Sequence, residues 1–334
     1  MPRQARLDNS GLLNHVIARA VGKEDLFRDE KDRELFLERL EACLEKSKAG
    51  CYAWVLMSNH IHLLIRTGIR PLSELMSKLL TGHAVYYNKK YRRHGHLFQN
   101  RYKSIICQEE VYFLELVRYI HLNPIRAGGV KSVEELDVYR WSGQSAVVGN
   151  KIRPWQDTES VLSLFGEKKK SSIERYREYI REGISMGKRP ELMGGGLIRS
   201  AGGLGEIEKR LARGEFELGD ERILGDGDFV QALLEQAEKK SGRSDQAQRK
   251  GWTLDKLAGA VAGYLGVSAK EIKRRNRRKE ISRGKGIVAW IAYEELGIRG
   301  TEIARYLKIS GAAVTKARER CKYEAEEISS KLIS

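Results

Sequence analysis

Two histidines separated by one residue, His60 and His62, lie inside a mostly apolar run that extends from Trp54 to Ile65. In an extended strand alternate side chains share a face, so both imidazoles would point the same way and could bind one metal ion together. The apolar neighbours would hold this strand in a hydrophobic core. A single histidine in such a setting is more often a hydrogen-bonded core or surface residue, so the metal-binding interpretation needs support from elsewhere in the chain.

That support comes later in the chain, in a helix-like segment from Leu116 to Pro124. Tyr119 and Asn123 are four positions apart, which places the phenol and the amide on one helix face, one turn apart. A tyrosine beside a third potential metal ligand is a plausible nucleophile for a phosphodiester. His121 would point about 160° away from Asn123, at about 100° per residue, so we interpret it as a packing residue or a phosphate contact.

The segments around these residues alternate between strand-like and helix-like patterns. Apolar residues at helical spacing, together with a proline and a glycine at helix ends, predict helices, and short apolar runs predict strands. The expected strands cover residues 12–18, 51–57, 60–66 and 101–107, and the expected helices cover residues 30–48, 72–91 and 109–123. The order βαββαβ, followed by a helix, predicts an α+β domain of the ferredoxin-like or split βαβ type, with an antiparallel sheet and helices on one face.

Four sequence blocks in this region carry a family resemblance. They are Asn14-His-Val-Ile-Ala-Arg19, Met57-Ser-Asn-His-Ile-His-Leu-Leu64, Gly95-His-Leu-Phe-Gln-Asn-Arg-Tyr-Lys-Ser104 and Arg118-Tyr-Ile-His-Leu-Asn-Pro-Ile-Arg-Ala127. In this order they resemble the HUH single-tyrosine transposases of the insertion-sequence type, and most closely their REP-associated tyrosine transposases. The His-x-His motif alone would be a weak signal, whereas four ordered blocks are specific.

The resemblance implies a metal-dependent tyrosine transposase, which is a DNA endonuclease and strand transferase. His60 and His62 would bind Mg²⁺ or Mn²⁺, with Asn123 as a third ligand where many relatives carry glutamine. Tyr119 would attack the scissile phosphate and leave a 5′-phosphotyrosine and a free 3′-hydroxyl, in DNA transposition or repeat mobilisation. Because this ligand set is neutral, it would hold a hard cation loosely until DNA phosphate completes the coordination.

The charge balance of the chain favours nucleic acid as its partner. The 334 residues carry a formal net charge of +16, and the isoelectric point is about 9.6.

No stretch approaches the roughly 20 apolar residues of a membrane span, and the N-terminus lacks an apolar signal core, so we expect a cytoplasmic, nucleoid-associated bacterial protein with no membrane partner. The four cysteines show no spacing typical of a zinc ribbon or a disulfide framework. Monomer and homodimer both remain open.

Basic and aromatic residues mix between the second expected helix and the fourth expected strand. The basic residues are Arg92, Arg93, Arg101 and Lys103, and the aromatic ones are Tyr91, Phe98 and Tyr102. Such a mixture suits the phosphates and stacked bases of single-stranded or hairpin DNA, although a solvated basic face is nearly as good an interpretation for each residue alone. His83, His94 and His96 are interpreted as surface or loop residues.

The last hundred residues contain a second basic region. Residues 239–285 hold 15 Lys/Arg against 4 Asp/Glu, a net charge of +11 in this stretch, which is typical of a protein that binds a phosphate backbone. The basic side chains expected to contact DNA include Lys273, Arg274, Arg275, Arg277 and Arg278. A solvated tail is the alternative, but apolar segments on both sides, such as an expected helix at 254–265, favour a folded domain.

Residues 301–320 have the pattern of a helix-turn-helix. Ser310, Gly311, Ala312, Thr315, Lys316 and Arg320 would face the major groove or its phosphates, although Lys308 stands where glycine often makes the turn. With residues 258–278, this region resembles the DNA-binding domain of the bacterial chromosomal replication initiator. That resemblance implies duplex DNA binding and no catalytic role.

We therefore predict a catalytic domain at residues 1–150, a helical and glycine-rich connecting region at 151–248, and a helix-turn-helix domain at 249–334. The glycine-rich residues 191–205 lack the Gly-Lys-Ser/Thr ending of a P-loop, so a hinge or turn is the better interpretation than a phosphate loop. Two alternatives to the transposase activity stay open. The same domains could form a catalytically inactive, sequence-specific DNA-binding regulator, or the histidines could support phosphodiester hydrolysis with water as the nucleophile.

Overall fold

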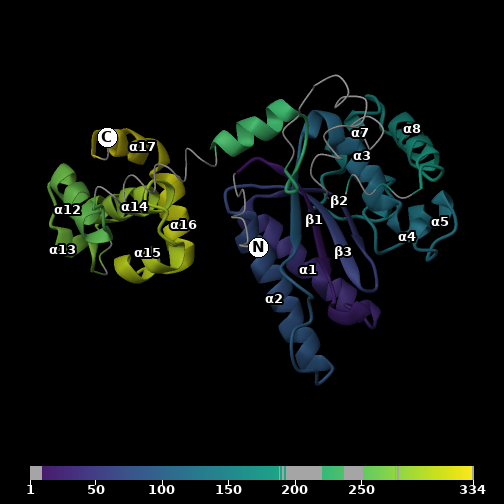
Figure 1. Cartoon of the computed structure of the whole chain (residues 1–334), viewed down its shortest axis with the longest axis horizontal. Coiled ribbons are helices and arrows are strands. Elements are labelled where there is room, and N and C mark those ends of the chain that lie inside the picture. Colours follow the sequence, from purple (N-terminus) through teal and green to yellow (C-terminus); the bar gives the residue numbers. More distant parts are fainter. Residues whose placement is uncertain are drawn as a thin grey trace, which may run out of the picture. The chain divides into compact units, whose positions relative to one another are not determined.

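The computed structural model describes residues 10–187, 189, 192, 220–236, 251–274, 276 and 278–332 (Figure 1). The chain divides into two compact units, Met1–Gln231 and Ala232–Ser334. Among the described residues, no helix combines the length and the apolar composition needed to cross a membrane.

The first unit contains a five-stranded sheet in the order β2-β3-β1-β4-β5. The strands are β1 (Leu13–Arg19), β2 (Gly50–Leu56), β3 (His60–Arg66), β4 (Lys103–Cys107) and β5 (Ile223–Leu224). The first four strands pair antiparallel and lie within one or two residues of their predicted positions. The α+β class is confirmed, but the sheet is mixed because β5 pairs parallel with β4. With two residues, β5 is too short to produce a strand pattern in the sequence.

Helices cover both faces of this sheet (Figure 1). On one face, α1 (Glu30–Ser47) and α2 (Leu72–Lys90) pack on Val16, Ile61 and their neighbours. On the other face, α3 (Glu109–His121) packs on Leu13, Leu64 and the residues around them. The expectation of helices on one face is therefore wrong for α3. β1 and β3 are buried on both faces along most of their length, so both sides of the sheet are covered there.

Shorter helices complete the first unit. They are η1 (Val21–Lys23), α4 (Asn123–Arg126), α5 (Val133–Val138), α6 (Gln144–Val147), α7 (Thr158–Ser163) and α8 (Lys169–Glu182). Val161 of α7 and Tyr176 of α8 are fully buried in the same hydrophobic core as α3. Residues 227–236 are also helical.

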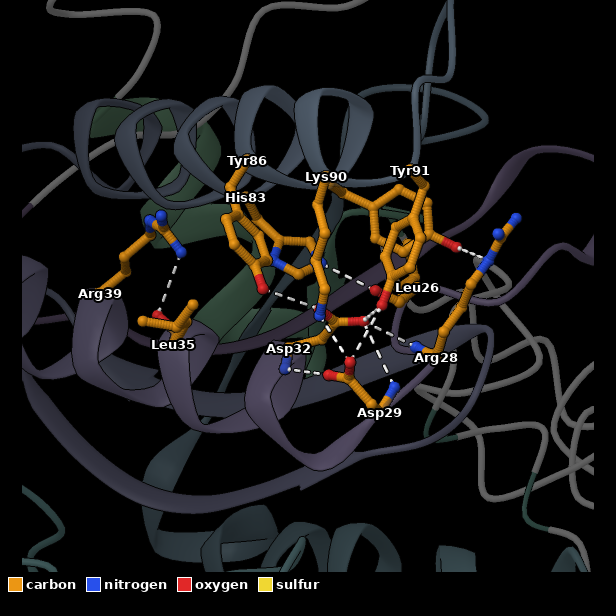
Figure 2. A network of polar contacts seen from close by, with 11 residues as sticks. Leu26, Arg28, Asp29, Asp32, Leu35, Arg39, His83, Tyr86, Lys90 and Tyr91 are labelled. Atoms are coloured by element: carbon orange, nitrogen blue, oxygen red, sulfur yellow. Dashed lines mark hydrogen bonds and ion pairs between the residues drawn. The ribbon is translucent and has the colours of Figure 1, made fainter.

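A polar network joins the start of α1 to the end of α2 (Figure 2). The buried Asp32 carboxylate accepts hydrogen bonds from Lys90 Nζ at 2.7 Å and from Tyr91 Oη at 2.7 Å. Burial acts to raise the pKa of Asp32, but these hydrogen bonds outweigh it and hold the pKa well below its usual value. His83 lies beside this network, fully buried, with Nε2 2.8 Å from the Leu26 carbonyl, so its interpretation as a surface residue is wrong. The network holds the end of α2 against the start of α1, and residues 91–102 connect this end of α2 to β4.

The described part of the second unit consists of helices and the turns between them. Its helices are α12 (Leu254–Leu265), α13 (Ala269–Ile272), α14 (Lys279–Glu294), α15 (Gly300–Leu307), α16 (Gly311–Arg320) and α17 (Lys322–Leu332). α14 is buried along most of its length and packs against α12, α16 and α17. α15 and α16 lie where the helix-turn-helix pattern predicts two helices. Lys308 adopts φ 52°, a left-handed conformation that glycine adopts more easily.

A buried lysine connects the parts of this unit. Lys285 Nζ donates hydrogen bonds to the Arg274 carbonyl at 2.6 Å and to the Leu307 carbonyl at 2.9 Å. Lys285→Met removes both donors but keeps most of the side-chain volume, so we expect a loss of roughly 1–3 kcal/mol in the free energy of unfolding of this unit. Denaturant unfolding measures the loss, with the exposed Lys279→Met on the same helix as the control. Equal stability of the two variants would contradict a structural role for Lys285.

Candidate active site

The histidine pair lies on the face of β3 that α3 covers. His60 and His62 alternate with Ile61, which points into the opposite core. The two imidazole ring centroids are 5.1 Å apart. His62 is buried, whereas His60 is half-buried at the start of the strand. The period-two pattern of the sequence predicts this shared face.

Tyr119 and Asn123 face the histidines from the end of α3. The Tyr119 ring centroid is 6.0 Å from that of His62. The predicted helix 109–123 is interrupted, because α3 ends at His121 and Asn123 begins α4. The predicted one-turn relation persists, since Asn123 Nδ2 donates to the Tyr119 carbonyl at 2.9 Å.

A cavity of about 800 Å³ brings these four residues together. His60, His62, Tyr119 and Asn123 all line it, and five basic side chains share its wall: Arg19, Arg101, Lys103, Arg126 and Arg189. The Arg126 guanidinium lies 5.0 Å from the centre of the Tyr119 ring. Arg126 also donates to the Tyr119 carbonyl at 3.1 Å, so its guanidinium is held against both the ring and the backbone of Tyr119. The cavity therefore combines a candidate nucleophile, candidate metal ligands and positive charge.

The donor atoms at this cavity suit a divalent cation. His60 Nδ1 lies 2.7 Å from Asn59 Oδ1, an acceptor, so Nδ1 carries the proton and Nε2 keeps a lone pair. Burial, with Arg19 nearby, lowers the pKa of His60 to about 4 and keeps the ring neutral. The Asn123 amide nitrogen bonds to helix carbonyls, which leaves its Oδ1 for a ligand. Two imidazoles and an amide oxygen are compatible with Mn²⁺ or Mg²⁺.

Asn123 is the predicted third ligand, and the amides of Gln99 and Asn100 line the same cavity. Among the described residues, no group of three or more histidine, cysteine, aspartate or glutamate side chains is arranged to hold a metal ion.

Sequence reasoning missed His15 of β1, which is fully buried beside the pair. His15 Nε2 is 2.9 Å from His62 Nδ1, and His15 Nδ1 is 3.1 Å from the Leu192 carbonyl. The His15 ring also meets the edge of the Tyr119 ring, with centroids 5.9 Å apart. Its neighbours Leu13 and Ile17 give a period-two signal that could have placed His15 on this face. Apart from Leu192, residues 191–205 lie outside the described part of the chain, so the predicted hinge is untested.

The predicted DNA-contacting residues of the first unit separate into two groups. Arg101 and Lys103 line the cavity, whereas Arg92 and Arg93 do not. Arg93 forms an ion pair with Glu24 at 2.7 Å and donates to the His96 carbonyl, so it stabilises its own loop. Three further basic residues of the cavity, Arg19, Arg126 and Arg189, are not among the predicted contacts, although Arg19 and Arg126 lie in the sequence blocks that carry the family resemblance.

His121 is a packing residue, as one of the two interpretations had it. The side chain is fully buried, and Nδ1 lies 2.6 Å from Tyr176 Oη of α8. Burial lowers the pKa of His121 to about 3, so the ring is neutral. A phosphate contact is incompatible with this burial.

In the second unit, the basic segment between α13 and α14 is partly described. Arg274 and Arg278 are exposed, whereas Lys273 pairs with Asp255 and lies over the Tyr306 ring. Arg275 and Arg277 lie outside the described residues.

The residues expected to face DNA from α16 do not all do so. Ser310 caps the helix by accepting from Ala313 N, and Lys316 is exposed. Thr315 is buried and its hydroxyl donates to the Gly311 carbonyl at 3.2 Å, so its predicted outward orientation is wrong. Arg320 is exposed but donates to the Ser282 carbonyl. Fewer of the predicted side chains of α16 are therefore exposed to solvent than the sequence pattern indicates.

Comparisons with known proteins bear on the first unit. Residues 9–123 match a protein-family model described as "Transposase IS200 like". The comparison with curated proteins gave no match. A similar solved structure is "Structure of the REP associates tyrosine transposase bound to a REP hairpin", with 15% sequence identity and a TM-score of 0.39 over 47% of this chain and 91% of that chain. The matched residues include the His60 and His62 pair, Tyr119 and Asn123. Residues 9–123 are therefore an IS200-like transposase domain.

Proposed function

We propose that this protein is a DNA nickase and strand transferase that acts on single-stranded or hairpin DNA through a covalent tyrosine intermediate. The observation that carries the proposal is the shared cavity of Tyr119, His60, His62 and Asn123 within a transposase domain. A regulator without catalytic activity would not need to keep a phenol, two imidazoles and an amide around one cavity.

In the proposed reaction, the Tyr119 phenolate oxygen attacks the phosphorus of the scissile phosphodiester. The new bond joins this oxygen to phosphorus, and the bond from phosphorus to the 3′ oxygen breaks, which gives a 5′-phosphotyrosine and a 3′-hydroxyl. Arg126 holds the Tyr119 ring in place, and Arg101 and Lys103 bind the phosphate backbone. Attack by a 3′-hydroxyl on the phosphotyrosine reverses the step and transfers the strand.

A divalent cation, Mg²⁺ or Mn²⁺, would be held by His60, His62 and Asn123. When bound there, it would polarise the scissile phosphate and stabilise the leaving 3′ oxygen. The histidines contribute neutral, preoriented imidazoles, and Asn123 contributes an oxygen whose position is fixed by the hydrogen bonds of its amide nitrogen.

The second unit, in this proposal, binds duplex DNA and tethers the catalytic domain to its site. The support is the pair α15 and α16, joined by a short turn, together with the exposed Arg274, Arg278 and Lys316. The sequence resemblance of this region to the DNA-binding domain of the replication initiator agrees with such a role. A helix at this position would contact the major groove mainly through its N-terminal residues.

A covalent-adduct assay tests the catalytic proposal. The full chain is incubated with a 5′- or 3′-labelled single strand that contains a hairpin, with Mg²⁺ or Mn²⁺, and analysed on a denaturing gel. We expect the label 3′ of the nick to migrate with the protein. A mobility shift without cleavage would favour the regulator, and cleavage without any adduct would favour hydrolysis by water.

The salt dependence of duplex binding tests the role of the second unit. The double variant Arg274→Ala, Lys316→Ala should weaken duplex binding and lower the slope of log K against log salt by about 0.9 for each phosphate that the protein no longer neutralises. Lys331→Ala is the matched control, because Lys331 is exposed on α17 and pairs with Glu327. The proposal for this unit fails if the double variant and the control give the same slope.

A further inference from the structure

His15 links two groups that are far apart in the sequence, the Leu192 carbonyl and the His62 imidazole. Its Nδ1 lies 3.1 Å from Leu192 O, and its Nε2 lies 2.9 Å from His62 Nδ1. The two rings are stacked, with centroids 5.2 Å apart and planes inclined by 24°. Both side chains are buried, so water does not compete for these hydrogen bonds.

The chemistry of these three groups determines where the protons lie. A carbonyl oxygen only accepts, so His15 Nδ1 must carry a proton and donate it to Leu192. In a neutral imidazole the other nitrogen is then an acceptor, so His15 Nε2 accepts a proton from His62 Nδ1. Neutral His62 protonated at Nδ1 has its lone pair on Nε2.

The surroundings of His15 agree with this assignment. The side chain is fully buried, and its two ring nitrogens face the acceptor and the donor that a neutral ring requires. A charged His15 would donate from both nitrogens and would force His62 into the opposite tautomer.

We propose that His15 is a positioning residue, which holds His62 in the tautomer and ring orientation that present its Nε2 lone pair to a divalent cation. This inference rests on the proposed function of the site, because it deepens the role of His62 as a ligand. The partner ligand His60 is oriented in the same sense by Asn59, a neighbour in sequence. His62 instead depends on the adjacent strand β1, and through it on Leu192. Hydrogen-bond partners of this kind fix the tautomers of metal-binding histidines in general.

Two measurements on the full-length protein test the inference. The tautomer of His62 is read from two-bond ¹⁵N–¹H spectra of the metal-free protein with labelled histidine, and the affinity for Mn²⁺ alone is read from the electron paramagnetic resonance signal of the free ion. We expect His62 to be protonated at Nδ1 in the wild type. In His15→Phe we expect a mixed or inverted tautomer and an affinity lower by about 10- to 100-fold. His15→Gln keeps an amide oxygen that can accept from His62 Nδ1, so we expect it to restore much of the affinity.

A matched control is available at another buried histidine. His83→Phe also replaces a fully buried imidazole of this unit, but away from the cavity, and should leave the His62 tautomer and the Mn²⁺ affinity unchanged. Protonation of wild-type His62 at Nε2 would overturn the inference without any variant. So would an unchanged tautomer in a folded His15→Phe.

These outcomes are separable from the proposed function. If the wild type forms the DNA adduct but His15→Phe keeps the wild-type tautomer and affinity, the role of His15 fails and the nuclease proposal stands. If His15 controls the tautomer but no adduct forms under any metal condition, the nuclease proposal fails and the positioning role stands.

Discussion

Tyr119→Phe is expected to abolish the covalent protein–DNA adduct and to reduce strand cleavage by at least about 10³-fold. The substitution removes only the phenolic oxygen, which is the atom proposed to attack phosphorus. The ring that packs at 6.0 Å from His62 and under the Arg126 guanidinium is retained, so the cavity and the fold should be preserved. Denaturing gels with labelled hairpin DNA measure the adduct, and a binding assay with the same DNA should give nearly wild-type affinity.

The matched control for this variant is Tyr112→Phe. Tyr112 lies on the same helix, two turns before Tyr119, and packs partly buried against the same core. It is not among the residues that line the cavity, so its phenylalanine variant should form the adduct at the wild-type rate. Cleavage that persists in Tyr119→Phe would refute the nucleophile assignment and favour water as the attacking group.

The residues that could be predicted from the sequence are those whose relation is local. His60 and His62 share a strand face because of the period of two, and Tyr119 and Asn123 share a helix turn because of their spacing. Both relations hold in the structure even though the helix is interrupted after His121. That these two local pairs line one cavity depends on the packing of α3 over β3, which no local pattern contains.

The features that sequence reasoning missed depend on contacts between distant segments. His15 meets His62 only because β1 lies next to β3 in the sheet, and Arg19 joins the cavity because it pairs opposite His60. The ion pair of Arg93 with Glu24 also joins two distant segments, and no local pattern in the sequence indicates it. The burial of His83 beside the network between α1 and α2 likewise depends on the packing of two helices, which no local pattern predicts (Figure 2).

In the second unit, too, features set by local sequence signals agree with the prediction, whereas features set by packing do not. The bounds of α12 agree with the prediction, because an N-cap threonine, an apolar face and a C-terminal glycine are all local signals. Thr315 was placed on the DNA face because its side chain is polar, but its neighbour Val314 packs on α14 and the helix buries both. At the border between the apolar and polar faces of an amphipathic helix, the surrounding packing decides whether a side chain is buried. The residue type alone does not.

A second large effect is expected on the stability of the first unit at acidic pH. All seven histidines of the chain lie within its first 121 residues, and none lies in the second unit. Burial lowers the pKa of His83 to about 4 and that of His121 to about 3, from an ordinary value of 6.5. The unfolded chain therefore binds protons that the folded chain excludes, as pH falls below about 6.5. The stability that neutral burial contributes is fully present above this pH and is lost progressively as pH falls through the folded-state values.

For His83 alone, the difference between 6.5 and about 4 corresponds to about 3 kcal/mol lost between pH 7 and pH 4. Denaturant unfolding at pH 7, 5.5 and 4.5 measures the loss, and the wild type should fall steeply over this range. Because carboxylates also titrate there, the informative quantity is the difference from His83→Phe, which should be less stable than the wild type at pH 7 and should fall less steeply. The transition of the second unit is the internal control, since it contains no histidine. Parallel pH profiles for the wild type and His83→Phe would mean that His83 is not held neutral in the fold, and that the contacts of its ring with Leu26 and Phe36 do not exclude the charged form.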